Sequence, residues 1–260
     1  MKIGFFDSGI GGLTVLHQAL SEVPADEFIY YADTDHVPYG TKSREEIIAY
    51  VDSAVNFLVC QEVAAIVIAC NTATSAAIDT MRSKYRIPIL GMEPAVKVAV
   101  KNASNKRIMI IATPLTVREE KLHNLLKQVD EERKVDLLPL PKLVLFAEEG
   151  QFNTEEVERY LVEELSRFNL DDYSTLVLGC THFNYFKDTL RKVLPEDIVF
   201  IDGIQGTINH LKNVLGINGV SKEGIPLIQY FKSGREVKDE IERRNLTGYL
   251  KRADEMSRFL

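Results

Sequence analysis

Short apolar runs alternate along the chain with longer stretches whose apolar residues recur every three or four positions. In the first half, the apolar runs predict strands over residues 2–6, 27–31, 64–69 and 87–91. The periodic stretches predict helices over residues 13–22, 44–62 and 73–85. Strands that alternate with helices are typical of βαβ units and parallel sheets.

The same pattern restarts in the second half, shifted by about 105–110 residues. Strands are predicted over residues 107–112, 135–140, 175–179 and 198–201, and helices over 116–129, 155–168 and 183–194. The tail adds a predicted helix over 208–215 and a strand over 227–231, which we expect to pack on the first domain. The pattern therefore predicts an α/β fold of two similar domains. Their mainly parallel sheets would face each other across a cleft as a pseudo-twofold internal repeat. The predicted domains are 1–97 plus 206–260, and 98–205.

Two cysteines occupy matching places in the two halves. Cys70 follows the apolar run 65–69, and Cys180 follows the run 176–179. A free cysteine often packs as a small hydrophobic residue, but two in matched settings favour a function. Both fall beyond the carboxyl ends of predicted strands, where open α/β sheets bind ligands, and a following helix N-terminus is expected to lower the pKa of a thiol. Cys60 lies away from the apolar face of its helix, so we assign it no role.

Two loops at the same edge carry further candidates. Residues 7–12 read Asp-Ser-Gly-Ile-Gly-Gly, and their glycines would let the backbone approach a ligand and bind an anion. A plain tight turn is the alternative, and Thr14 replaces the third glycine of a dinucleotide fingerprint. Residues 33–40 form either a polar turn or a ligand loop. A lone histidine is usually structural, but the position of His182, two residues after Cys180, favours a functional role.

Composition narrows the class of protein. The chain has 260 residues, of which 45% are hydrophobic and 27% charged, as in globular domains. Three cysteines argue against a disulfide framework. A net charge of −7, with no basic run longer than two residues, argues against nucleic acid as a partner. No signal peptide or membrane span is predicted from the hydrophobic pattern, and we expect a cytoplasmic protein.

In combination, these motifs resemble those of the glutamate racemases, within the cofactor-independent amino-acid racemases. The matching segments are residues 6–16, 33–34, 38–40, 69–73, 93–95, 112–113, 116–117 and 178–182. The sequence departs at Asn184-Tyr185, where the family usually has Pro-Leu, and at Leu140-Pro141, where Cys-Pro is common. The first departure is expected to alter packing behind Cys180.

The resemblance implies an amino-acid racemase that uses two thiol bases and no cofactor or metal. Cys70 would take the α-proton from D-glutamate and Cys180 from L-glutamate. Asp7 and His182 match groups that assist these thiols, and Glu148 matches a carboxylate behind them. Substrate contacts are implied for Asp7, Ser8, Tyr39, Gly40, Asn71, Thr72, Thr116, Thr181 and His182. The resemblance also implies a homodimer that supplies D-glutamate for peptidoglycan biosynthesis.

Two thiols suit this chemistry, because racemisation removes a proton from one face of the α-carbon and returns one to the other. Bases with a pKa near the working pH exchange roles readily, and hydrogen-bond donors around the carboxylate would stabilise the carbanion. Three alternatives stay open: an aspartate racemase, a non-catalytic amino-acid-binding protein, and a thiol oxidoreductase. For a thiol oxidoreductase, the chain lacks a C-x-x-C motif, and the fold would have to bring Cys70 and Cys180 together.

Overall fold

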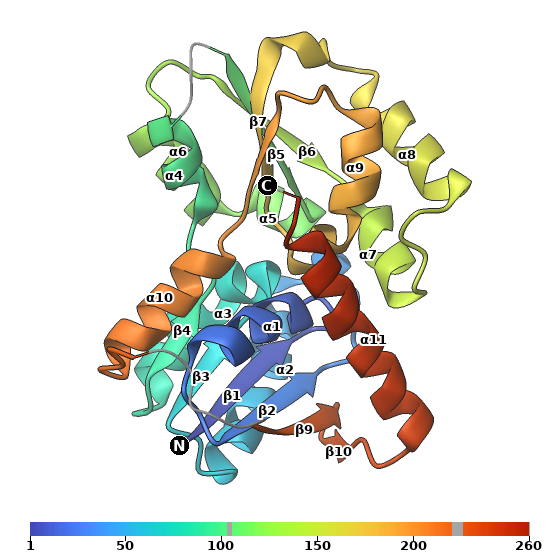
Figure 1. The fold of residues 1–260 in the computed structure, drawn as a ribbon. Helices are drawn as coiled ribbons and strands as arrows, with labels where there is room; N and C mark the ends of the chain where they lie inside the picture. The colour runs from blue at the N-terminus through green and yellow to red at the C-terminus, as the bar shows by residue number, and fades with distance from the viewer. Residues whose placement is uncertain (103–105, 220–225, 260) are drawn as a thin grey trace.

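A computed structural model describes residues 1–102, 106–219 and 226–259, and Figure 1 shows two α/β units, one above the other. The lower unit contains a six-stranded sheet in the order β10-β9-β2-β1-β3-β4. Its strands are β1 (Lys2–Asp7), β2 (Glu27–Ala32), β3 (Ala65–Ile68), β4 (Ile89–Gly91), β9 (Leu227–Lys232) and β10 (Arg235–Glu236). Its helices are α1 (Leu13–Glu22), η1 (Tyr39–Thr41), α2 (Arg44–Cys60), α3 (Asn71–Lys84), α10 (Ile204–Val214) and α11 (Glu240–Met256).

The upper unit is built on a four-stranded sheet in the order β6-β5-β7-β8. Its strands are β5 (Arg107–Ala112), β6 (Val135–Pro139), β7 (Tyr173–Leu178) and β8 (Val199–Ile201). The helices of this part of the chain are α4 (Ala95–Asn102), α5 (Pro114–Arg118), α6 (Glu120–Val129), α7 (Pro141–Glu148), α8 (Glu155–Leu165), η2 (Leu170–Asp172), η3 (Thr181–Phe186) and α9 (Lys187–Val193).

The two sheets share one topology. β1 lies between β2 and β3 with β4 outside β3, and β5 lies between β6 and β7 with β8 outside β7. All these pairs are parallel, and only the short β9–β10 pair is antiparallel within the described sheets. This arrangement confirms the predicted α/β class, the mainly parallel sheets and the internal repeat.

The tail adds to the first sheet. β9 pairs in parallel with β2 over the whole of both strands. Helix α11 packs against α1 and also against η3 of the other unit, so the end of the chain contacts both units. The predicted domain boundaries stay a prediction.

Several helical segments differ from the sequence expectation. The helix predicted over 116–129 is two helices, because Glu119 has extended backbone (φ −64°, ψ 130°) between α5 and α6. The helix predicted over 183–194 begins as the 3-10 segment η3 and becomes α-helical only at Lys187. Helices α4 and α7, of eight residues each, were not predicted. Helix α7 starts at Pro141, directly after a strand, and eight residues offer little helical periodicity.

Burial matches the expectation for the strands that lead to the two cysteines. All four residues of β3 are buried, as are five of the six in β7, which is expected for strands covered on both faces. The predicted apolar face of α2 is also confirmed, since Ile47, Val51, Ala54, Val55 and Leu58 are buried. Cys60, at the end of that helix, is exposed. No helix in the described part of the chain has the length and apolar character needed to span a bilayer.

Candidate active site

Each of the two cysteines stands between a central strand and a helical segment. Cys70 follows β3 and is itself the N-cap of α3, with its Sγ accepting a hydrogen bond from Ala73 N at 3.4 Å. Cys180 follows β7 and precedes η3, but its side chain makes no cap hydrogen bond there. Both thiols are buried, each at 5% exposure. The matched settings in the sequence therefore lead to similar positions with different hydrogen bonding.

The surroundings of Cys70 disfavour its thiolate. Burial, followed by the negative charge of Asp7, raises the pKa of Cys70 to about 12. The Ala73 N–H and the hydroxyl of Ser8, whose Oγ lies 3.6 Å from Cys70 Sγ, act in the opposite direction but more weakly. The charge of Cys180 also contributes, which places the two sulfurs within electrostatic reach of each other. The N–H at the N-terminus of α3 lowers the pKa of this thiol as expected, but desolvation raises it by more, so the net shift is upward.

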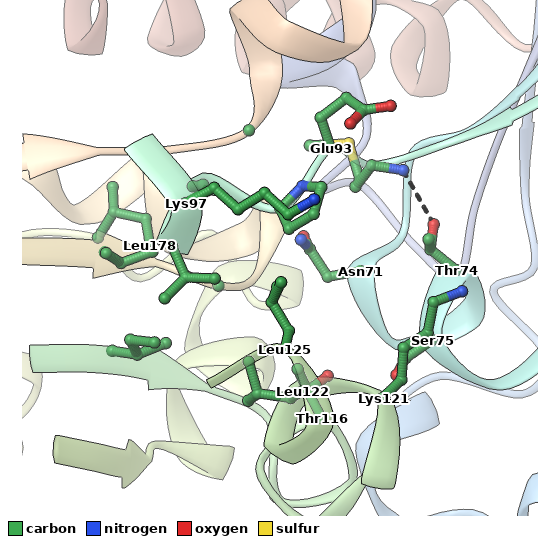
Figure 2. Close-up of a pocket in the computed structure, with 18 residues that line it drawn as sticks. Asn71, Thr74, Ser75, Glu93, Lys97, Thr116, Lys121, Leu122, Leu125 and Leu178 are labelled. Carbon is green, nitrogen blue, oxygen red and sulfur yellow. Dashed lines mark hydrogen bonds between the residues drawn. The ribbon is translucent and has the colours of Figure 1, made fainter. Parts of the chain in front are cut away.

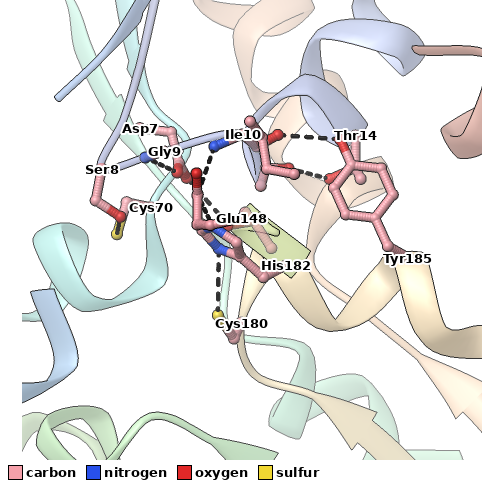
Figure 3. Close-up of polar contacts among 12 residues, drawn as sticks. Asp7, Ser8, Gly9, Ile10, Thr14, Cys70, Glu148, Cys180, His182 and Tyr185 are labelled. Atoms are coloured by element: carbon pink, nitrogen blue, oxygen red, sulfur yellow. Dashed lines mark hydrogen bonds and ion pairs between the residues drawn. The ribbon is translucent and has the colours of Figure 1, made fainter. Parts of the chain in front are cut away.

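Cys180 lies at the end of a hydrogen-bonded chain of three side chains. Its Sγ is 3.8 Å from His182 Nδ1, and His182 Nε2 is 2.6 Å from Glu148 Oε1 (Figure 3). Burial alone would lower the pKa of His182. The hydrogen bonds to Cys180 and Glu148, with their negative charges, nevertheless raise it well above its ordinary value. His182 therefore lies between the sulfur of Cys180 and the carboxylate of Glu148, within reach of both for proton exchange.

Asp7, at the end of β1, is fully buried and bridges the two units. It accepts hydrogen bonds from Gly9 N at 2.8 Å and from the hydroxyl of Thr181 at 3.0 Å. Burial raises the pKa of Asp7, while the charge of His182 and both hydrogen bonds oppose that rise. Asp7 thus joins the first strand of one sheet to the segment that follows Cys180.

The glycine-rich turn after Asp7 lies directly against side chains of the other unit. A Cβ on Gly9 would lie 1.8 Å from Glu148 Oε1, and one on Gly11 would lie 2.4 Å from both His182 Nδ1 and Thr181 Oγ1. Two N–H groups of the turn already donate to carboxylates of the protein: Gly9 N to Asp7, and Ile10 N to Glu148 at 2.9 Å. The glycines therefore allow the close approach of side chains from the other unit.

Hydroxyl groups from both units form a second cluster. Thr72 on α3 lies 2.9 Å from Thr113 and 3.3 Å from Thr116, measured between the side-chain oxygens. Thr113 is the N-cap of α5, and its side-chain oxygen accepts from Thr116 N. A Cβ on Gly40 would meet Thr113 Cβ at 2.8 Å, so the loop after β2 also reaches this cluster.

Tyr39, in the same loop, is held by Asp33. Its hydroxyl donates to Asp33 Oδ2 at 2.6 Å, and Asp33 also accepts from Ser233 in the tail. Burial and then the charge of Asp33 raise the pKa of Tyr39. The loop 33–40 is thus an ordered hydrogen-bonded structure at the strand edge.

A cavity of about 290 Å³ lies between the units beside these clusters (Figure 2). Asn71 and Thr116 line it, together with the connecting segments around Glu93 and Gly203. Among its described lining residues there is no thiol, so this cavity adjoins the cysteine site without containing it.

Comparisons with known proteins agree with one another. Residues 11–211 match the family described as Asp/Glu/Hydantoin racemase. The chain belongs to this racemase family. The glutamate racemase of Campylobacter curvus is 50% identical over 262 residues, covering 98% of each chain. That of Halothermothrix orenii is 51% identical over 252 residues, covering 96% of this chain and 98% of the relative.

Solved structures are similar over almost the whole chain. The Escherichia coli glutamate racemase, in complex with L-glutamate and the activator UDP-MurNAc-Ala, has a TM-score of 0.81 at 26% identity, covering 97% of this chain and 94% of that one. The Francisella tularensis enzyme with D-glutamate has a TM-score of 0.79 at 30% identity, covering 96% and 93%. The resemblance found in the sequence is confirmed. The chain is an isomerase, an amino-acid racemase.

The structure of this racemase brings most of the predicted site residues together. Asp7, Ser8, Cys70, Glu148, Cys180, Thr181 and His182 form one connected group, and Gly40, Thr72 and Thr116 form the neighbouring one. Asn71 lines the adjacent cavity, and Tyr39 bonds to Asp33. Sequence reasoning assigned no role to Thr113 or Tyr185, although residues 112–113 were among the matching segments and Tyr185 was named as a departure from the family pattern. The internal repeat offered a signal for Thr113, because it follows β5 as Ser8 follows β1.

Proposed function

We propose that this racemase interconverts L- and D-glutamate by proton transfer between two cysteines at the α-carbon. The observation that carries the proposal is the pair of buried strand-end thiols, Cys70 and Cys180, in unlike electrostatic settings. The substrate is inferred from the relatives, whose names and bound ligands are those of glutamate racemases.

In the direction from L- to D-glutamate, the Cys180 thiolate takes the α-proton from one face. The Cys70 thiol then gives its proton to the opposite face, so that the two sulfurs exchange protonation states. The raised pKa of Cys70 supports its role as the thiol donor, and the contact of His182 Nδ1 with Cys180 Sγ supports the role of His182 as the group that assists Cys180. Backbone N–H and threonine hydroxyl groups are the proposed donors to the substrate carboxylates.

The proposed biological role is supply of D-glutamate for peptidoglycan biosynthesis by a cytoplasmic homodimer. These points follow from the sequence resemblance, and a dimer can be tested by light scattering of the purified protein.

The decisive experiment is circular dichroism of the purified protein with L- or D-glutamate and no added cofactor. We expect racemisation from both enantiomers, and expect Cys70→Ala and Cys180→Ala each to lower kcat by about 10²–10⁴-fold. Cys60→Ala is the matched control, because that thiol is exposed on α2. Full racemisation by Cys70→Ala would refute the mechanism. Faster turnover of aspartate than of glutamate would indicate an aspartate racemase. Tight glutamate binding without turnover would indicate a binding protein.

A further inference from the structure

Tyr185 lies behind the Cys180 site and is fully buried. Its hydroxyl donates to the carbonyl of Ile10 at 3.0 Å (Figure 3). The N–H of Ile10 donates to Glu148 Oε1 at 2.9 Å, and Glu148 Oε1 also contacts His182 Nε2. Glu148 and Tyr185 therefore hold the N–H and the carbonyl of Ile10.

These contacts close a ring. From Tyr185 the path runs through Ile10 to Glu148, through Glu148 to His182, and back along η3 to Tyr185, only three residues after His182. A closed ring fixes the direction of each member more tightly than any single contact does, because one member cannot turn without breaking a neighbouring bond. His182 is the member that contacts Cys180.

The ring is anchored from outside by the C-terminal helix. Arg252 on α11 donates to the carbonyl of Tyr185 from Nε at 3.2 Å and from a terminal nitrogen at 2.8 Å, and it also pairs with Asp188. The rings of Phe152 and Tyr249 pack on Tyr185, with centroids at 5.3 and 6.0 Å. Tyr185 thus has a fixed backbone and a fixed ring plane, which aims its hydroxyl at Ile10.

The geometry points to Tyr185 as a positioning residue that orients Glu148 and His182 toward Cys180, and so acts on one of the two proton transfers only. This inference rests on the proposed function. No hydrogen bond joins Tyr185 to the described side chains around Cys70, whose sulfur lies within hydrogen-bond distance of Ser8 Oγ and Ala73 N.

The test is Tyr185→Phe, which removes the hydroxyl and keeps the packed ring. The carbonyl of Ile10 still accepts from Leu13 N, so no buried group loses its last partner and the variant is expected to fold. Tyr160→Phe is the matched control, since its buried hydroxyl has no hydrogen-bond partner within the described parts of the chain. We expect Tyr185→Phe to lower kcat/KM roughly 3- to 30-fold and the control to leave it unchanged.

Kinetic isotope effects distinguish an effect on one proton transfer from a general loss of activity. Enantiomers have equal free energies, so kcat/KM is the same in both directions and cannot itself reveal which thiol is affected. With substrates deuterated at the α-carbon, impaired transfer at Cys180 makes that step more rate-limiting. The isotope effect on kcat/KM should therefore rise for L-glutamate and fall for D-glutamate. A lower kcat/KM with both isotope effects unchanged would overturn the inference.

A second readout needs no turnover. Iodoacetamide alkylation, followed for each cysteine-containing peptide by mass spectrometry, should slow severalfold at Cys180 in Tyr185→Phe and stay unchanged at Cys70, with exposed Cys60 as the internal reference. Equal rates at Cys180 in the wild type and the variant would overturn the inference. A wild-type protein that does not racemise glutamate would refute the proposed function, while alkylation would still decide the role of Tyr185.

Discussion

Replacement of Gly11 by alanine tests whether the glycine turn exists to admit the side chains of the other unit. The new Cβ would lie 2.4 Å from His182 Nδ1 and 2.4 Å from Thr181 Oγ1, whereas ordinary van der Waals contact begins at 3.4 Å. Because both groups are this close, either both must move away from the turn by about 1 Å, the difference between the two distances, or the turn must move away from them. Such a shift disturbs the contacts of His182 with Cys180 and of Thr181 with Asp7.

A misplacement of about 1 Å near reacting groups costs on the order of 10²-fold in rate, and overpacking a filled interior costs about 1–3 kcal/mol of stability. We therefore expect Gly11→Ala to remain folded with kcat/KM for glutamate lowered about 10²-fold, measured by circular dichroism alongside urea unfolding. Gly4→Ala is the control, because the three atoms nearest to its Cβ would all belong to the Leu58 side chain, at 3.2 to 3.5 Å. A folded Gly11→Ala protein with wild-type kcat/KM would refute this reasoning.

Three further predictions concern charge and stability. Asp7→Asn removes a negative charge that raises the pKa of Cys70, so iodoacetamide should alkylate Cys70 faster at about pH 9; an unchanged rate would show that burial alone governs this thiol. The pKa of His182 is raised on folding, so its stabilising contribution is complete below its unfolded pKa of about 6.5 and is lost as the pH rises through the folded value. The difference in unfolding free energy between wild type and His182→Asn should accordingly be largest near pH 6 and narrow toward alkaline pH, and a difference that widens with pH would contradict this. Thr154→Ala removes the hydroxyl that caps α8 at Val157 N and should lower the free energy of unfolding by about 1 kcal/mol with kcat/KM unchanged; a loss of activity would show that α8 is coupled to the site.

Local sequence was enough to predict the strands, most helices and the positions of both cysteines. The apolar runs before Cys70 and Cys180 are nearly uninterrupted because their strands are covered on both faces, and this pattern is readable without any knowledge of their neighbours. The internal repeat was also visible in the sequence, because each half of the chain carries the strand and helix pattern of its own βαβ units. Short helices were the exception, because α4 and α7 have too few turns to show a period.

The sequence by itself determined which residue types stand at the strand edge, because periodicity and turn chemistry are set by near neighbours along the chain. Only the tertiary structure decided which of them meet. Glu148 reaches Ile10 from 138 positions away, and Tyr185 reaches it from 175. The high pKa of Cys70 likewise arises from burial against Asp7 and overrides the local helix terminus. Contacts and desolvation of this kind depend on how two sheets pack together, and no pattern within either half contains that information.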